Sequence, residues 1–230
     1  MRTLGLLGGM SWESTLPYYR ALNERVRERL GGLHSAKMLL ASVDFAEIEP
    51  LMRADRWDEA GALLGHTAAV LERGGAEGLV LCTNTLHKVA PAIEKAVSIP
   101  ILHIVEPTAD AVRRKGLKTV GLLATRFTME ADFYVERLRQ HGLEAVVPDA
   151  SDRAEVHRVI FEELCLGKVR EASRRSYQDI IRRLALAGAQ GVILGCTEIA
   201  MLISPEDSPL PVFDTTALHA ERAIDWALAA

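Results

Sequence analysis

Short apolar runs alternate along this chain with longer segments in which apolar residues recur at helical spacing. The short runs are flanked by Gly and Pro and are too short for helices, which is typical of buried parallel strands. The pattern predicts strands at residues 4–7, 38–43, 78–81, 101–104, 120–123, 145–147, 192–194 and 212–213. It predicts helices near residues 14–30, 57–73, 86–96, 106–115, 130–141, 153–166, 170–187 and 216–228. This alternation indicates βαβ units, parallel sheets and right-handed crossovers.

The chain nearly repeats itself. Residues 3–7 (TLGLL) recur as 119–123 (TVGLL), residues 71–85 recur without a gap as 184–198, and residues 99–101 recur as 210–212. Because the three matches keep their order and nearly the same spacing, the chain holds two copies of one α/β unit. We expect an α/β fold of two similar halves, residues 1–115 and 116–230, that face each other across one cleft. The last helix, near 216–228, is a candidate to pack back on the first half.

Polar or small residues follow several of the predicted strands, just before the next helix. In open α/β sheets, ligands bind outside the carboxyl ends of the strands, so these clusters are expected at the cleft. The clusters are Gly8-Gly9-Met10-Ser11, Thr83-Asn84-Thr85, Thr125-Arg126 and Cys196-Thr197-Glu198.

Composition removes several classes of function. A net charge of −4 gives no basic footprint for nucleic acid or for an anionic membrane surface. The longest apolar runs are far shorter than a membrane span. The 3 cysteines form no CxxC motif and no Cys/His cluster, so neither a disulfide framework nor a zinc site is expected, and a reducing cytoplasm fits. We therefore expect no metal and no nucleotide cofactor, since GxGxxG and Gly-Lys-Ser/Thr motifs are missing from the sequence.

Two of the strand-end clusters have two interpretations each. Backbone N–H groups near Met10 and Ser11 are suited to an anion at a helix N-terminus, or the segment is a tight turn with a serine cap. The hydroxyl and amide groups of Thr83, Asn84 and Thr85 can hold a carboxylate, or they can cap the next helix.

Cys196 is the candidate nucleophile or base. It follows a strand and precedes a predicted helix, whose N-terminus is expected to lower the pKa of the thiol. The alternative is a small buried apolar residue. In the ungapped repeat Cys196 matches Thr83, whereas Cys82 matches Gly195. Adjacent strand residues point to opposite faces, so Thr83 is favoured over Cys82 as the group that faces Cys196.

These residues together resemble the aspartate/glutamate racemase family, whose members work without pyridoxal phosphate. The motifs that carry the resemblance span essentially the whole chain: GLLGGMSWEST (5–15), LCTNTLHK (81–88), IFEELCLGK (160–168) and LGCTEI (194–199). The resemblance implies two Rossmann-like halves related by a pseudo-twofold axis, an active site between them, and often a homodimer. It also implies a two-base mechanism with one cysteine from each half.

The sequence departs from the family pattern at two positions. The family's first-half Cys-Asn-Thr is Thr83-Asn84-Thr85 here, which resembles the branch with a Thr/Cys pair. Some aspartate racemases carry a lysine near the position of Cys165, and its loss puts strict acidic specificity in doubt. Lys168 lies one turn further on, and Arg53, beside Met52, is the nearest match to the family's side-chain arginine.

The sequence thus predicts a cofactor-independent amino-acid racemase, with aspartate or glutamate as first choice and D-amino acids among its products. Cys196 and Thr83 are the expected catalytic pair, and the substrate-binding candidates are Met10, Ser11, Met52, Arg53, Asn84, Thr85, Thr197 and Glu198. Two alternatives stay open. One is a broad-specificity racemase or a related isomerase or decarboxylase. The other is a protein that binds amino acids without catalysis.

Overall fold

The computed structural model describes residues 1–229, which divide into two compact units. Unit 1 comprises Met1–His103 together with the chain from His219 onward, and unit 2 comprises Ile104–Leu218. Sequence analysis placed the boundary between residues 115 and 116. The structure places it earlier, because the buried side chains of Val105, Ala109 and Val112 pack into the core of unit 2.

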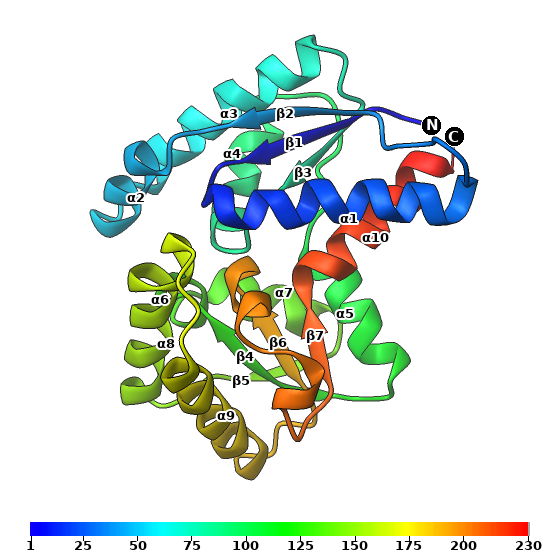
Figure 1. Ribbon diagram of the computed structural model, residues 1–230. Helices are drawn as coiled ribbons and strands as arrows, with labels where there is room; N and C mark the ends of the chain where they lie inside the picture. Colours follow the sequence, from blue (N-terminus) through cyan, green and yellow to red (C-terminus); the bar gives the residue numbers. More distant parts are fainter. Residues whose placement is uncertain (230) are drawn as a thin grey trace. The chain divides into compact units, whose positions relative to one another are not determined.

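Unit 1 is built on a parallel sheet of three strands in the order β2-β1-β3 (Figure 1). Helices α1 and α10 cover one face of the sheet, while α3 packs against β1 from the other face and contacts α4. The strands are β1 (Leu4–Gly8), β2 (Met38–Ser42) and β3 (Gly78–Leu81), and the helices are α1 (Trp12–Leu30), α2 (Phe45–Arg53), α3 (Trp57–Arg73), the 3₁₀ segment η1 (Thr85–Val89), α4 (Ala90–Glu94) and α10 (Thr215–Leu228).

Unit 2 has a parallel sheet of four strands in the order β5-β4-β6-β7. Helices α8 and α9 contact each other and β4, and α5 and α7 contact each other (Figure 1). The strands are β4 (Thr119–Ala124), β5 (Glu144–Val146), β6 (Val192–Gly195) and β7 (Val212–Asp214). The helices are α5 (Val105–Arg114), α6 (Arg126–Met129), α7 (Asp132–Gln140), α8 (Ala150–Glu162), η2 (Leu164–Leu166), α9 (Glu171–Leu186), η3 (Thr197–Met201) and η4 (Pro205–Asp207).

The strand registers agree with the internal repeat of the sequence. In unit 1 Gly5 pairs with Leu79, and in unit 2 Gly121 pairs with Val192. A Cβ atom on Gly5 would meet side chains of Leu71 and Ala76, at the end of α3, and a Cβ atom on Gly121 would meet Leu184 of α9. The two glycines therefore have the same surroundings in the two units, and β1, α3 and β3 correspond to β4, α9 and β6. The predicted α/β fold with parallel sheets in two halves is confirmed.

One predicted strand is not formed, and helix α2 of the structure was not predicted. The strand expected at 101–104 is only an isolated bridge between Leu79 and Ile101, because the chain turns into α5 at Val105. Helix α2 was not predicted, since Pro50 within it is a usual helix breaker. Its start carries a signal, because the Asp44 side chain accepts a hydrogen bond from the Ala46 N–H at 3.0 Å.

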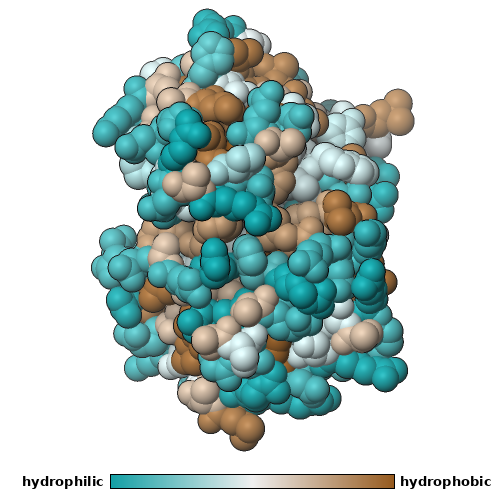
Figure 2. All heavy atoms as spheres, turned by 90° about the vertical axis from the view of Figure 1, so that its left-hand side faces the viewer, coloured by the Kyte–Doolittle hydropathy of each residue, from teal (hydrophilic) through white to brown (hydrophobic). Residues whose placement is uncertain are grey.

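Two predicted helices are interrupted. The helix expected at 86–96 begins as the 3₁₀ segment η1 and continues as the short helix α4. The helix expected at 153–166 ends at Glu162, and its last residues form the separate segment η2. No described helix is long and apolar enough to cross a membrane. On the face shown in Figure 2, hydrophilic residues predominate and apolar residues are interspersed among them.

The C-terminal helix α10 is fastened to unit 1 by a buried histidine. His219 is fully buried, and its Nε2 lies 2.5 Å from the Leu102 carbonyl oxygen. Because a carbonyl only accepts, Nε2 carries the proton, and Nδ1 accepts from the Tyr18 hydroxyl at 2.8 Å. Burial lowers the pKa of His219 to about 4, so the ring is neutral at physiological pH.

We expect His219 to make the protein less stable in mild acid. The unfolded histidine binds a proton near its ordinary pKa, whereas the folded one resists until about pH 4, so stability is lost as pH falls through this window. The shift corresponds to about 3 kcal/mol of unfolding free energy. Urea unfolding of wild type and His219→Gln at about pH 7 and about pH 5 measures it, and the variant should lose less stability than wild type. The exposed His66→Gln is the matched control. Equal losses in wild type and His219→Gln would contradict the prediction.

Candidate functional site

The segment after β6 brings a thiol and a carboxylate together in unit 2. Cys196 is the first residue beyond β6, and its thiol donates to Glu198 Oε2 at 3.0 Å. The Thr197 hydroxyl donates to the same oxygen at 2.8 Å. Glu198 is buried, with 2% of its surface exposed. The three consecutive residues therefore form one hydrogen-bonded group centred on a buried carboxylate.

The electrostatics of Cys196 differ from the prediction. Burial is the main cause that raises the pKa of the Cys196 thiol well above its usual value, and the negative charge of Glu198 raises it further. The helix expected to lower this pKa is η3, a 3₁₀ segment of 5 residues, which is too short for a large helix dipole. The expected lowering is therefore wrong, and the thiol keeps its proton at neutral pH.

A second segment of unit 2 lies beside Cys196. η2 contacts η3, and Cys165 of η2 is one of the groups that raise the Cys196 pKa. The Glu163 carbonyl accepts from the N–H groups of Leu166 and Lys168, at 3.0 and 2.9 Å, and so fixes the path of this segment. Cys165 is thus a neighbour of Cys196.

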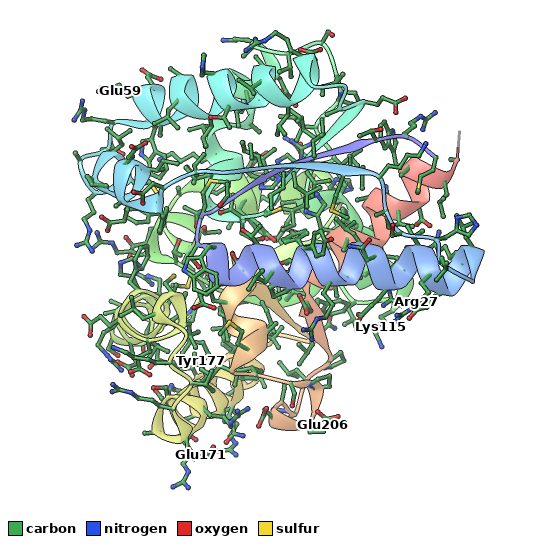
Figure 3. All side chains as sticks on the ribbon, turned by 45° about the horizontal axis from the view of Figure 1, so that its top comes forward. Arg27, Glu59, Lys115, Glu171, Tyr177 and Glu206 are labelled. Carbon is green, nitrogen blue, oxygen red and sulfur yellow. The ribbon has the colours of Figure 1, made fainter. Side chains whose placement is uncertain are left out.

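The η2 segment is anchored by an ion pair between the buried Glu163 and the partly exposed Arg158, which sequence analysis missed. The Glu163 carboxylate accepts from the Ser173 hydroxyl at 2.5 Å and from Arg158 at 2.9 Å. These hydrogen bonds and the Arg158 charge hold the pKa of Glu163 below its ordinary value against the opposing effect of burial. Tyr177 of α9, labelled in Figure 3, donates to the Val156 carbonyl at 2.9 Å and ties α9 to α8. The only sequence signal was the position of Glu163 within the IFEELCLGK motif.

Thr83 occupies the position in unit 1 that Cys196 occupies in unit 2. Leu7 pairs with Leu81 and Leu123 pairs with Leu194, so the second residue after each pair is Thr83 and Cys196. Cys82 corresponds to Gly195, where a Cβ atom would meet Leu122 at 2.7 Å.

The thiol of Cys82 belongs to the core of unit 1. Cys82 is fully buried with Leu4, Leu6 and Tyr18 on the α1/α10 face of the sheet. Burial raises the pKa of this thiol far above its usual value, which makes it inert. Thr83 is the second residue beyond β3 and is itself buried, with 5% of its surface exposed.

Asn84 and Thr85 follow Thr83 into the 3₁₀ segment η1 and are both buried. The Asn84 carbonyl accepts from the His87 N–H at 3.1 Å, and the imidazole Nδ1 of His87 lies 2.7 Å from the Thr83 carbonyl oxygen. The side chain of Asn84 makes no capping hydrogen bond to η1. The segment therefore holds three adjacent polar side chains at the carboxyl end of β3.

The Gly8–Ser11 turn connects β1 to α1. Gly9 has φ +91, and a Cβ atom there would lie 2.2 Å from the Val43 carbonyl oxygen, so only glycine fits. The Gly9 N–H donates to Thr15 Oγ1 at 2.9 Å, and the Ser11 carbonyl accepts from the Ser14 and Thr15 hydroxyls. The N–H of Gly9 is thus used within the turn, and an anion role stays with the Met10 and Ser11 N–H groups as a prediction.

Met52 and Arg53 end helix α2. Met52 is buried, whereas Arg53 is exposed and forms an ion pair with Glu49 one turn earlier. A side-chain carboxylate would have to compete with Glu49 for Arg53. Within residues 1–229, no group of three or more His, Cys, Asp or Glu side chains is arranged to hold a metal ion.

Each unit holds a parallel sheet flanked by helices. In each unit a hydrogen-bonded polar segment follows the equivalent strand, β3 in unit 1 and β6 in unit 2. The chain belongs to the Asp/Glu/Hydantoin racemase family, whose model matches residues 7–223. The resemblance inferred from the sequence is therefore confirmed. The prediction that the protein is a racemase, which is a kind of isomerase, is confirmed as well.

Individual relatives agree with this membership. The chain is 53% identical to a putative Asp/Glu racemase from Yersinia pestis, with a TM-score of 0.91 over 99% of this chain and 100% of the other. It is 34% identical to an aspartate racemase homologue from Pyrococcus horikoshii OT3, with a TM-score of 0.85 over 99% and 100% of the two chains. It is 24% identical over 233 residues, 98% of each chain, to the broad specificity amino-acid racemase RacX of Bacillus subtilis (strain 168).

We expect Glu198→Gln to lower the pKa of Cys196. The substitution removes the negative charge that opposes the thiolate and keeps the size of the side chain. Alkylation of the Cys196 peptide by iodoacetamide, followed by mass spectrometry across a pH series, should therefore become faster at neutral pH. Glu206→Gln, at an exposed position of η4, should leave the pH profile unchanged. An unchanged or higher titration midpoint in Glu198→Gln would refute the electrostatic role of Glu198.

Proposed function

We propose that this protein racemises a free α-amino acid without a cofactor, with Cys196 and Thr83 as the acid–base pair. One observation carries the proposal: the strand registers make Thr83 and Cys196 equivalent residues of the two units. Racemisation needs a group for each face of Cα, and two equivalent positions of a duplicated fold supply such groups.

In the proposed mechanism, Glu198 receives the thiol proton of Cys196. The two groups already share a hydrogen bond of 3.0 Å. An amino-acid substrate brings an ammonium group, whose positive charge favours the thiolate and offsets the burial that raises the thiol pKa. The thiolate then takes the Cα proton of the L-enantiomer, and a proton returns to the opposite face from Thr83 or from a water that it holds. The cycle closes when Glu198 releases its extra proton to solvent and Thr83, or its water, takes one back, so the net reaction moves protons only.

The α-carboxylate needs donors as negative charge develops on the substrate. We assign this role to Asn84, Thr85 and Thr197, with the N–H groups of Met10 and Ser11. Hydrogen-bond donors at a buried site stabilise such charge more than donors in water do. Glu198 then acts on the thiol, rather than binding substrate directly.

The side-chain pocket is proposed to be permissive. Cys165, a neighbour of Cys196, brings no positive charge where some relatives have lysine, and Arg53 is already paired with Glu49. Aspartate and glutamate stay the first substrates to test, because relatives carry these names. RacX is described as broad in specificity, so non-acidic amino acids belong in the same panel. The homodimer and the cytoplasmic location stay predictions.

Cα exchange in heavy water tests this function directly. Wild type should exchange the Cα proton of several amino acids, acidic and non-acidic, and this activity should survive EDTA and hydroxylamine. Cys196→Ala should lose exchange by at least about 10²-fold, because general acid–base catalysis contributes that much. Met201→Ala, at the far end of the same η3 segment, is the matched control and should keep the wild-type rate.

The alternative functions correspond to other outcomes of this assay. Binding of amino acids without exchange would indicate a non-catalytic binding protein. Exchange that requires an added metal or pyridoxal phosphate would refute the cofactor-free mechanism. Activity on hydantoins alone would show that the substrate is a hydantoin and not a free amino acid, within the same family.

A further inference from the structure

Thr83 immediately precedes Asn84, the N-cap of the 3₁₀ segment η1, so its carbonyl lies outside the hydrogen-bonded turns of that segment. The first turn is closed by the His87 N–H, which donates to the Asn84 carbonyl at 3.1 Å. The imidazole Nδ1 of the same His87 reaches one residue further back and lies 2.7 Å from the Thr83 carbonyl oxygen. Because the carbonyl only accepts, Nδ1 carries the proton, which is the less common tautomer of histidine in water.

The ring of His87 is held from the other side by buried rings of unit 1. Its centroid lies 4.4 Å from that of His103 and 5.9 Å from that of His219, both with steeply inclined planes. His219 is itself fixed by Tyr18 and by the Leu102 carbonyl. All three histidines are buried, so the orientation of His87 is determined by packing as well as by its hydrogen bond.

The equivalent segment of unit 2 lacks this device. There the Cys196 carbonyl accepts from the backbone N–H of Ile199 at 3.1 Å, and the residue that corresponds to His87 in the repeat is Ala200. An imidazole therefore holds the main chain only in unit 1, where the candidate catalytic group is the hydroxyl of Thr83. A hydroxyl is a poor acid and base near neutral pH and depends more on placement than a thiol does.

We propose that His87 is a positioning residue for Thr83: its Nδ1–H fixes the Thr83 carbonyl, and with it the direction in which the Thr83 side chain leaves the sheet edge. The proposal rests on the proposed function, in which Thr83 serves one face of Cα. His87 contacts neither substrate nor the reacting atoms in this role. It acts through the main chain of Thr83.

Two variants of His87 separate the hydrogen bond from the ring. The amide nitrogen of asparagine lies about where Nδ1 of histidine lies, whereas that of glutamine lies near Nε2. His87→Gln should lower kcat for racemisation by about tenfold to hundredfold with little change in KM, as for a misplaced catalytic group. His87→Asn should recover most of this loss. Exchange of the L-enantiomer, which Cys196 performs, should fall much less than racemisation in His87→Gln.

A measurement on wild type needs no substitution. The ¹⁵N shifts of the His87 ring should report a protonated Nδ1 at neutral pH. A protonated Nε2 with a bare Nδ1 would overturn the proposal, as would equal ratios of L-exchange to racemisation in wild type and His87→Gln. Absence of any Cα exchange in wild type would instead refute the proposed function, and the positioning role with it.

Discussion

The register of two parallel strand pairs, β1 with β3 and β4 with β6, determines which side chains leave the sheets as candidate catalytic groups. Each pair advances in step, so the residue two positions beyond Leu81 in unit 1 corresponds to the one two positions beyond Leu194 in unit 2. These two residues are Thr83 and Cys196. A shift of one residue in this register would make Cys82, and not Thr83, the equivalent of Cys196. The observed pairing of Leu7 with Leu81 excludes that shift, and Cys82 lies fully buried in the core of unit 1.

Burial and charge place the two candidate groups under different constraints. Cys196 is a thiol whose pKa is raised by burial and by Glu198, so it needs a change of charge around it before it can act as a base. In the proposed mechanism, an ammonium group on the substrate provides such a change, which couples deprotonation to binding. Thr83 has no comparable means of ionising near neutral pH, and its contribution depends on geometry. The hydrogen bond from His87 to the Thr83 carbonyl supplies that geometry from within unit 1.

Most of the fold was predictable because its strands and helices have local sequence patterns and because the same α/β pattern occurs in both halves of the chain. Short apolar runs and helical periodicity located 7 of the strands that the structure contains. The repeat also identified Thr83 as the match to Cys196. Helix α2 was missed: it contains Pro50, a residue that usually breaks helices, and the sequence signal for its start is the capping residue Asp44. The pKa direction of Cys196 was wrong because helix length and burial are not visible in a motif. The anchoring of η2 by Glu163 and Arg158 depends on contacts between helices, which periodicity does not reveal.

The central claim is that the Cys196 thiol and the Thr83 hydroxyl, at two equivalent strand ends, each transfer a proton at one face of Cα. Enantiomers have equal free energies, so kcat/KM for racemisation is the same in both directions, and Cα exchange is the measurement that distinguishes the two acid–base groups. The most direct test compares Cys82→Ala with Thr83→Ala, each assayed for Cα exchange from the L- and the D-enantiomer. Cys82→Ala should keep both rates near wild type, and Thr83→Ala should lose exchange mainly from the D-enantiomer. Severe loss in Cys82→Ala with Thr83→Ala unaffected would contradict the equivalence of Thr83 and Cys196 in function.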